Sequence, residues 1–430
     1  MRSDKAVTDN TDKSGRMKIV WICHFTDYQV QSILKPWREK AQFAPWITHT
    51  LKVFEDRGDL ELHIVSPHEY ISGVKEYVRN GVHYHFFNPF IPIWGRHWPG
   101  FFKWDVWTNY TMNKRVVQRI VRSINPDVIH LQGAENPYYS STALQFLEVY
   151  PVVVNFQRFA LDIIQNADEK SETREKIEKE LWENARYFTI RTQVMQSEFG
   201  SFRPDAKLYW VNYACAEMPT GSPEKNYDIV FFSRINKIKG IEDLLEAIAL
   251  LSRGGHEFRA CVIGPVSEQY LTFLKEKARK LGVQNLITWK GVLNSQRDVH
   301  IEAQKAKICV LPTHKDVIPG AIIESMQLGL PVVSYKAGSI PELNEERENV
   351  LLSDIGDIEG VADNILRLLT DEELYKTMSQ HGIECIRERY SNQNVLQQHL
   401  DCYREVIADF QNSKIKKQVT ESSLRNGYTD

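Results

Sequence analysis

Short apolar runs alternate with helical patterns along most of this chain, and the alternation occurs in two successive blocks. The first block contains the runs KIVWIC (18–23), DVIHL (127–131) and PVVVN (151–155), and the second extends from YDIVFF (227–232) to NVLL (349–352). Nearly continuous apolar strands separated by helices indicate parallel sheets that are buried on both faces. Because 430 residues are about three times a typical domain length of ~150, we expect two doubly wound α/β domains in series. Such a pair usually binds its ligand in the cleft between the domains.

Segments without apolar periodicity mark the expected domain boundaries. Residues 1–16 are polar throughout, and residues 217–226 (EMPTGSPEKN) hold two prolines and a glycine, which is typical of a linker. We therefore expect, in chain order, a disordered leader (1–16), a first α/β domain (17–216), a linker (217–226), a second α/β domain (227–391), a helix (392–412) and a flexible tail (413–430).

The composition excludes several classes of protein. A formal net charge of −3 argues against a chain built mainly to hold nucleic acid. No apolar run approaches the ~18 residues needed to span a bilayer, and the N-terminus has no stretch typical of a signal peptide. The six cysteines form no CxxC pair, so buried reduced thiols are expected rather than a disulfide or metal framework. We therefore expect a cytoplasmic protein, or one at the inner face of the membrane.

The strongest local signal is the stretch ICVLPTHKDVIPGAIIESMQLGLPVV (308–333). It predicts a buried strand, a polar loop and a helix that begins near Pro319–Gly320 and closes at Gly329. The start of such a helix directs N–H groups and the positive end of its dipole at the loop, which favours an anion such as phosphate. Asp316 lies in the loop and Glu324 in the helix, so both carboxylates can border one ligand and accept hydrogen bonds from sugar hydroxyls.

A second signal is the stretch FFSRINKIKGIEDLLEAI (231–248). Arg234 and Lys239 lie five residues apart in a strand-to-helix loop, where both can reach a diphosphate. Two ordinary solvated loop cations are the alternative. The occurrence of the acidic motif downstream favours the diphosphate interpretation.

Together these motifs resemble the signature of the family 4 (group 1) retaining glycosyltransferases of the GT-B fold. That family has two acidic residues with seven between them, followed by a pattern like EAMAxGxPVV, and this chain has Asp316, Glu324 and SMQLGLPVV. The stretch from Arg234 to Ile248 is similar to the family's GR…KG element. The resemblance covers about residues 225–345. The chain departs from it in carrying Asp316 where Glu is usual and Val317 where Gly commonly follows.

The resemblance implies two Rossmann-like doubly wound parallel-sheet domains that face a central cleft, with the helix at 392–412 returning to the first domain. It implies a metal-independent enzyme without a cofactor, which moves a sugar from a nucleotide-diphospho-sugar to a hydroxyl acceptor with retention, in glycan or surface polysaccharide synthesis. Asp316, Arg234 and Lys239 would be catalytic. The expected donor-binding residues are Arg234, Lys239, Gly264, Val292, Asp316, Val317, Ile318, Pro319, Gly320 and Glu324.

The first domain would bind the acceptor, which is a glycan, a lipid-linked sugar or a small molecule. The acceptor-side candidates lie at the ends of two predicted strands: His130, Glu135, Gln157 and Arg158. The alternative for His130 is that it lies in the core with its hydrogen bonds satisfied and does not contact the acceptor. Gln157 and Arg158 stand where many family members carry His followed by Gly or Thr. These departures leave two alternative functions open, a non-catalytic scaffold or partner subunit and a nucleotide-sugar epimerase.

Residues 86–110 hold four Trp and five Phe, with Arg96, His97 and Lys103 among them. Aromatic side chains beside cations suit the headgroup region of a membrane. They also suit stacking on sugar rings, or a long loop folded over its own domain. Peripheral membrane contact through this segment is therefore one of three interpretations.

Overall fold

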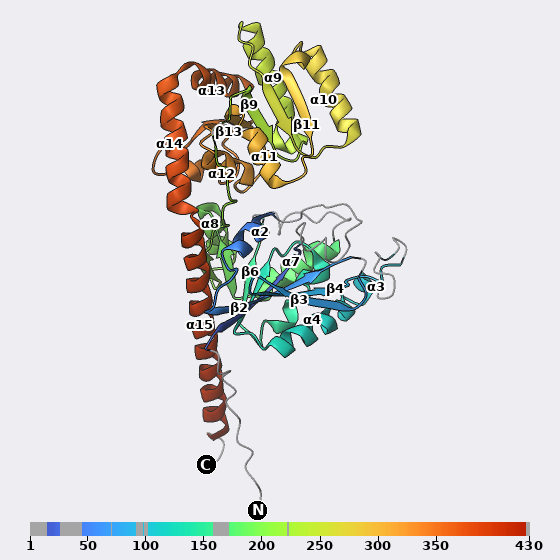
Figure 1. Cartoon of the computed structure of the whole chain (residues 1–430). Coiled ribbons are helices and arrows are strands. Elements are labelled where there is room, and N and C mark those ends of the chain that lie inside the picture. The colour runs from blue at the N-terminus through green and yellow to red at the C-terminus, as the bar shows by residue number, and fades with distance from the viewer. Residues whose placement is uncertain are drawn as a thin grey trace, which may run out of the picture.

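The computed structural model describes residues 15–25, 45–69, 71–91, 98, 102–157, 172–221 and 223–426. Two α/β units follow one another along the chain, and Figure 1 shows them as separate layered bodies. Each unit is built on one sheet with helices against it. The leader expected at 1–16 lies almost entirely outside the described residues.

The first unit contains an eight-stranded sheet in the order β3-β4-β2-β1-β5-β6-β7-β8 within the described chain. Its strands are β1 Met17–Cys23, β2 Leu60–Pro67, β3 Val74–Arg79, β4 Val82–Phe87, β5 Val128–Gln132, β6 Val152–Asn155, β7 Tyr187–Ile190 and β8 Lys207–Trp210. All neighbouring strands pair in parallel except β3, which is antiparallel to β4. The expected parallel sheet is thus present, with one antiparallel strand at its edge, and β3 is partly exposed and lacks the apolar run that marks the other strands.

Helices cover this sheet where their apolar sides can be buried. In α4 the side chains of Val117, Ile120, Val121 and Ile124 are buried, at the spacing of one helical face. The helices of the unit are α2 Pro45–Lys52, α3 Trp104–Trp107, α4 Thr111–Ile124, α5 Pro137–Ser140, α7 Glu172–Asn184 and α8 Gln193–Phe202, with a 3₁₀ turn η1 at Leu144–Phe146.

The second unit contains a six-stranded parallel sheet in the order β11-β10-β9-β12-β13-β14. Its strands are β9 Tyr227–Phe232, β10 Ala260–Ile263, β11 Ile287–Gly291, β12 Ala306–Leu311, β13 Val332–Tyr335 and β14 Val350–Ser353. Its helices are α9 Ile241–Arg253, α10 Glu268–Lys280, α11 Gln296–Ala303, α12 Gly320–Gln327, α13 Ile358–Thr370 and α14 Glu372–Arg389, with 3₁₀ turns η2 Lys237–Lys239, η3 Gln284–Leu286 and η4 Ile340–Asn344.

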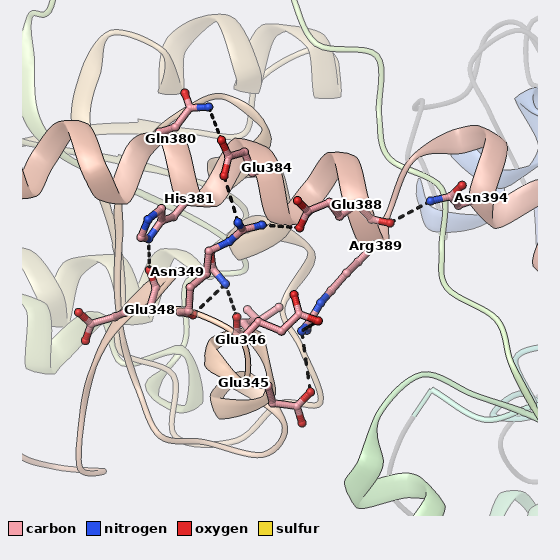
Figure 2. Close-up of polar contacts among 12 residues, drawn as sticks. Glu345, Glu346, Glu348, Asn349, Gln380, His381, Glu384, Glu388, Arg389 and Asn394 are labelled. Carbon is pink, nitrogen blue, oxygen red and sulfur yellow. Dashed lines mark hydrogen bonds and ion pairs between the residues drawn. The ribbon is translucent and has the colours of Figure 1, made fainter.

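Ion pairs and hydrogen bonds fasten α14 to the loop that follows η4 (Figure 2). Arg347 of that loop pairs with Glu384 at 3.1 Å and also with Glu388. In the same region Arg389 lies 3.6 Å from Glu346. These contacts hold the last helix of the second unit at the point where the chain turns toward the first unit.

The helix α15 spans Asn392–Asn426 and runs alongside the first unit (Figure 1). Its Leu400, Cys402, Tyr403 and Val406 belong to the buried cluster of that unit. The segment 413–430, expected to be a flexible tail, is helical as far as Asn426, so the helix expected at 392–412 is longer than predicted.

No helix in the described part of the chain is both long enough and apolar enough to cross a bilayer. All six cysteines are free, and five of them are buried. The burial expected for most of the thiols is thus observed.

Candidate active site

A cavity of about 280 Å³ lies where the two units meet. The first unit contributes Gln157 and Arg191 to its wall, and the second contributes Asp316 and Glu324. The two carboxylates of the strongest sequence motif thus border one space, as the spacing predicted. Val317, Ile318 and Gly320 line the same cavity.

Asp316 lies in the loop between β12 and α12 and contacts Lys239 through an ion pair. Asn236 fixes the turn that carries this lysine, because its side chain accepts a hydrogen bond from the Lys239 amide at 3.0 Å. Next to Asp316, the side chain of Val317 is buried in the apolar cluster of the first unit. The departure from Gly at this position therefore adds an apolar contact between the two units.

Glu324 lies on α12, and its Oε2 accepts two hydrogen bonds from α11. Gln296 donates its side-chain amide at 2.8 Å, and His300 lies 3.0 Å away through Nε2. Since a carboxylate only accepts, the His300 Nε2 must carry the proton in this bond. At the start of α12, Pro319 supplies no side-chain cap, so the first N–H groups and the positive dipole end face the cavity loop.

Arg234 is not brought into this cavity. It is exposed and lines a separate hollow of about 470 Å³ together with Asn236 and Pro265. Gly264 lies at the edge of this region with φ of +143°, and a Cβ there would overlap the Ser233 carbonyl oxygen. Val292 is 72% exposed after β11. These three expected donor residues are therefore not among those that line the cavity of Asp316 and Glu324.

Of the acceptor-side candidates, some lie at the cavity and others do not. Gln157 lines the cavity, and its backbone N–H donates to Glu135 Oε1 at 2.6 Å. His130 is instead buried under α15, where its Nδ1 lies 2.7 Å from the Tyr403 hydroxyl, and burial lowers its pKa well below the usual value. The core alternative therefore holds for His130. Arg158 lies outside the described residues.

Sequence reasoning missed several cavity residues of the first unit, among them Arg191, Tyr213, Trp46 and His49. Burial lowers the pKa of His49, and burial raises the pKa of Tyr213 to about 12, so both rings are neutral at neutral pH. Arg191 could have been found from its position in the sequence. It directly follows β7, and residues at the carboxyl ends of parallel strands face the ligand cleft.

Residues 217–384 match the family model described as glycosyl transferases group 1. Most of the second unit is therefore similar to group 1 glycosyl transferases. The resemblance indicated by the two motifs is thereby confirmed. The N-acetyl-alpha-D-glucosaminyl L-malate synthase of Bacillus anthracis is 25% identical over 195 residues, which are 45% of this chain and 50% of that protein. The chain spans about half the length of the curated relatives it matches.

Two solved structures resemble the whole described chain. The sucrose-phosphate synthase of Thermosynechococcus elongatus, 15% identical, superposes with a TM-score of 0.70 over 92% of this chain and 100% of that one. Anabaena Alr3699/HepE in complex with UDP and glucose, 16% identical, gives a TM-score of 0.64 over 91% of this chain and 100% of that one. The GT-B fold expected from the sequence is confirmed.

Proposed function

We propose that this chain is a glycosyltransferase that moves a sugar from a nucleotide-diphospho-sugar to a hydroxyl acceptor in the cavity between its two units. The observation that carries the proposal is the joint presence of Asp316 and Glu324 on one cavity wall, with Lys239 paired to Asp316. The first unit lines the same cavity from its other side, and we assign the acceptor to that side. The bound UDP and glucose of the HepE complex support a nucleotide sugar as donor.

The leaving diphosphate needs compensating positive charge in this reaction. Lys239 supplies a full charge, and the open N-terminus of α12 at Pro319–Gly320 supplies oriented N–H groups. Arg234, which lines a second hollow, would meet a more distant part of the nucleotide. Asp316 would accept hydrogen bonds from the sugar and Glu324 from the ribose.

We further propose that the reaction retains the anomeric configuration through attack on the face that the diphosphate leaves. The bond from the sugar C1 to the β-phosphate oxygen breaks, and the acceptor oxygen bonds to C1 on the same face. The leaving phosphate oxygen takes the acceptor's proton. This route is favoured because the scheme already uses both carboxylates for binding: Asp316, which pairs with Lys239, holds the sugar, and Glu324, which α11 holds through Oε2, accepts from the ribose. Metal ions are not required in this scheme, since Lys239 and α12 carry the compensating charge.

A role in glycan or surface polysaccharide synthesis at the inner face of the membrane completes the proposal. Peripheral contact would come from the aromatic segment 86–110, of which Trp104 and Trp107 are exposed.

The donor site is tested by thermal unfolding of the wild type and Lys239→Ala with UDP, GDP, ADP and their common sugar conjugates. We expect one nucleotide to raise the Tm of the wild type by a few degrees, and Lys239→Ala to lose most of this shift. Lys336→Ala is the matched control, because Lys336 also pairs with an aspartate, Asp354, but lies outside the cavity.

The reaction itself is tested by NMR of the product, in which retention predicts the anomeric coupling of the donor sugar. An inverted product would refute the same-face route. Absence of any nucleotide shift in the wild type would refute the donor site and favour a non-catalytic scaffold, and conversion of the donor sugar without an acceptor would favour an epimerase.

A further inference from the structure

One cation of the cavity, Arg191, forms no ion pair with a carboxylate of the described residues. Arg191 follows β7 and lines the cavity wall of the first unit. Within the described residues its Nε is buried without a hydrogen-bond partner, and the contact found for its guanidinium is with the ring of Tyr213. Arg191 is partly buried, and a partly buried guanidinium without an ion-pair partner is favourably placed to bind a ligand anion.

The guanidinium is held in place by an aromatic stack. Its central carbon lies 4.0 Å from the centroid of the Tyr213 ring, and the Trp46 ring stacks on Tyr213 at 4.4 Å and 27°. Because two groups cannot occupy the same ring face at these distances, Tyr213 lies between Trp46 and Arg191. The Tyr213 hydroxyl donates to Asn155 Oδ1 at 3.0 Å, and Asn155 in turn donates to Thr189 Oγ1 at 2.9 Å. The stack is thus anchored to β6 and β7, and the cation is preorganised.

The carboxylates of the opposite wall are already engaged. Asp316 pairs with Lys239, and Glu324 accepts from Gln296 and His300. The positive charge of Arg191 therefore remains available on the side of the cavity that belongs to the first unit.

We propose that Arg191 binds a carboxylate or phosphate group of the acceptor, so that this chain glycosylates an anionic acceptor. The inference rests on the proposed function, in which the donor binds at the wall of Asp316 and Glu324 and the acceptor binds at the opposite wall. The guanidinium fork matches the oxygen pairs of both anions and forms strong charge-assisted hydrogen bonds with them.

The test measures binding of two anionic probes, L-malate and sn-glycerol 3-phosphate, and of their neutral counterparts, L-malate dimethyl ester and glycerol. Titration calorimetry is done on the full chain, with and without the nucleotide that stabilises it. The variants are Arg191→Gln, which removes the charge, and Arg191→Lys, which keeps the charge and loses the fork. Arg279→Gln is the control, because Arg279 is exposed on α10 and pairs with Glu276.

We expect at least one anionic probe to bind the wild type and Arg279→Gln more tightly than its neutral counterpart. Arg191→Gln should weaken this binding about tenfold to a hundredfold, Arg191→Lys should weaken it less, and the affinity for the nucleotide should stay the same in both. The transfer assay should then show a raised KM for the acceptor with kcat nearly unchanged.

Equal binding of anionic and neutral probes, or no binding of either anionic probe, would overturn the proposal. So would a loss of nucleotide affinity in Arg191→Gln as large as the loss of probe affinity, because Arg191 would then belong to the donor site. If the wild type binds no nucleotide, the proposed function fails, while binding of an anionic probe that depends on Arg191 would still support the anion site.

Discussion

Glu324 shows how a neighbouring helix can fix one cavity carboxylate. Both of its hydrogen bonds from α11 fall on Oε2, from Gln296 and His300. Among the described residues no hydrogen bond is found on Oε1, so that oxygen remains for a ligand hydroxyl. Since His300 is buried and only its Nε2 reaches Glu324, we regard it as a positioning residue.

Removal of Glu324 or of His300 should therefore affect the same use of the donor. We expect Glu324→Gln to lower kcat/KM for the donor about a hundredfold, and His300→Phe, which keeps the ring volume, to lower it about tenfold. The double variant should be no slower than Glu324→Gln alone, because His300 acts only through the carboxylate. Steady-state kinetics of the four proteins give the coupling, and circular dichroism checks their folding. Additive losses would contradict a positioning role.

The sequence predicted the residues of this wall because one continuous motif contains them. Asp316 and Glu324 are separated by a single loop and a helix start, so their meeting follows from local geometry. His300 and Arg191 come from elements with no such pattern, and only the tertiary fold brings them to the cavity. Arg234 lines a different hollow from Asp316, because five residues of spacing do not determine the direction of a loop side chain, and its role toward the diphosphate stays a prediction.

At the scale of elements, the turn after β13 supports the Asp316 loop. Gly338 has φ of +54°, and a Cβ there would overlap the carbonyl oxygen of Asp316. The next residue reinforces this contact, since the Ser339 amide donates to the Val317 carbonyl at 2.9 Å. The loop that carries Asp316 is thus held by backbone atoms that leave no room for a side chain.

Comparison of two glycines separates the stability cost of this close contact from the stability cost of backbone strain. Gly356 has φ of +85° but open space around it, so Gly356→Ala should cost about 1 kcal/mol of stability from the left-handed backbone alone. Gly338→Ala should cost about 2 kcal/mol more, because the loop must also move. Denaturant unfolding measures both, and nucleotide affinity should fall only in Gly338→Ala. Equal losses of stability would show that the close contact contributes nothing.

The elements that sequence patterns missed are those without a continuous apolar run. The strand β3 (VKEYVR) mixes charged and apolar residues at a partly exposed edge, and α11 (QRDVHIEA) buries only His300 and Ala303 among its residues. The end of α15 was also missed, because its last turns extend beyond the buried contacts of Tyr403 and Val406.

At the scale of the whole molecule, the Glu342 carboxylate links the second unit to the first. The Glu342 carboxylate, in η4 of the second unit, accepts from the backbone N–H groups of Gln193 at 2.7 Å and Val194 at 3.1 Å. It thereby caps the start of α8 in the first unit, where an anion also complements the helix dipole. Neither composition nor periodicity predicts such a contact between the units. The family resemblance predicted only that the two domains face a central cleft.

The outer surface of the first unit carries the remaining unexplained sequence feature. Trp107 is 67% exposed and Trp104 is 42% exposed, and the Phe102 ring contacts both. The helix α4, which follows directly, exposes Arg115, Arg119 and Arg122. Exposed aromatic side chains beside arginines suit an anionic membrane surface better than a loop folded over its own domain, which would bury them.

We therefore predict that the protein sediments with vesicles that contain anionic phospholipid and not with purely zwitterionic ones. Trp104→Ala combined with Trp107→Ala should reduce the bound fraction about tenfold or more, because each indole loses its insertion into the headgroup region. Trp210→Ala is the control, since Trp210 is similarly exposed, at 43%, but lies on β8. Retained nucleotide stabilisation in the double variant would show that its donor site is intact. Equal sedimentation of all three proteins would exclude this surface as a membrane contact and leave sugar stacking as its remaining role.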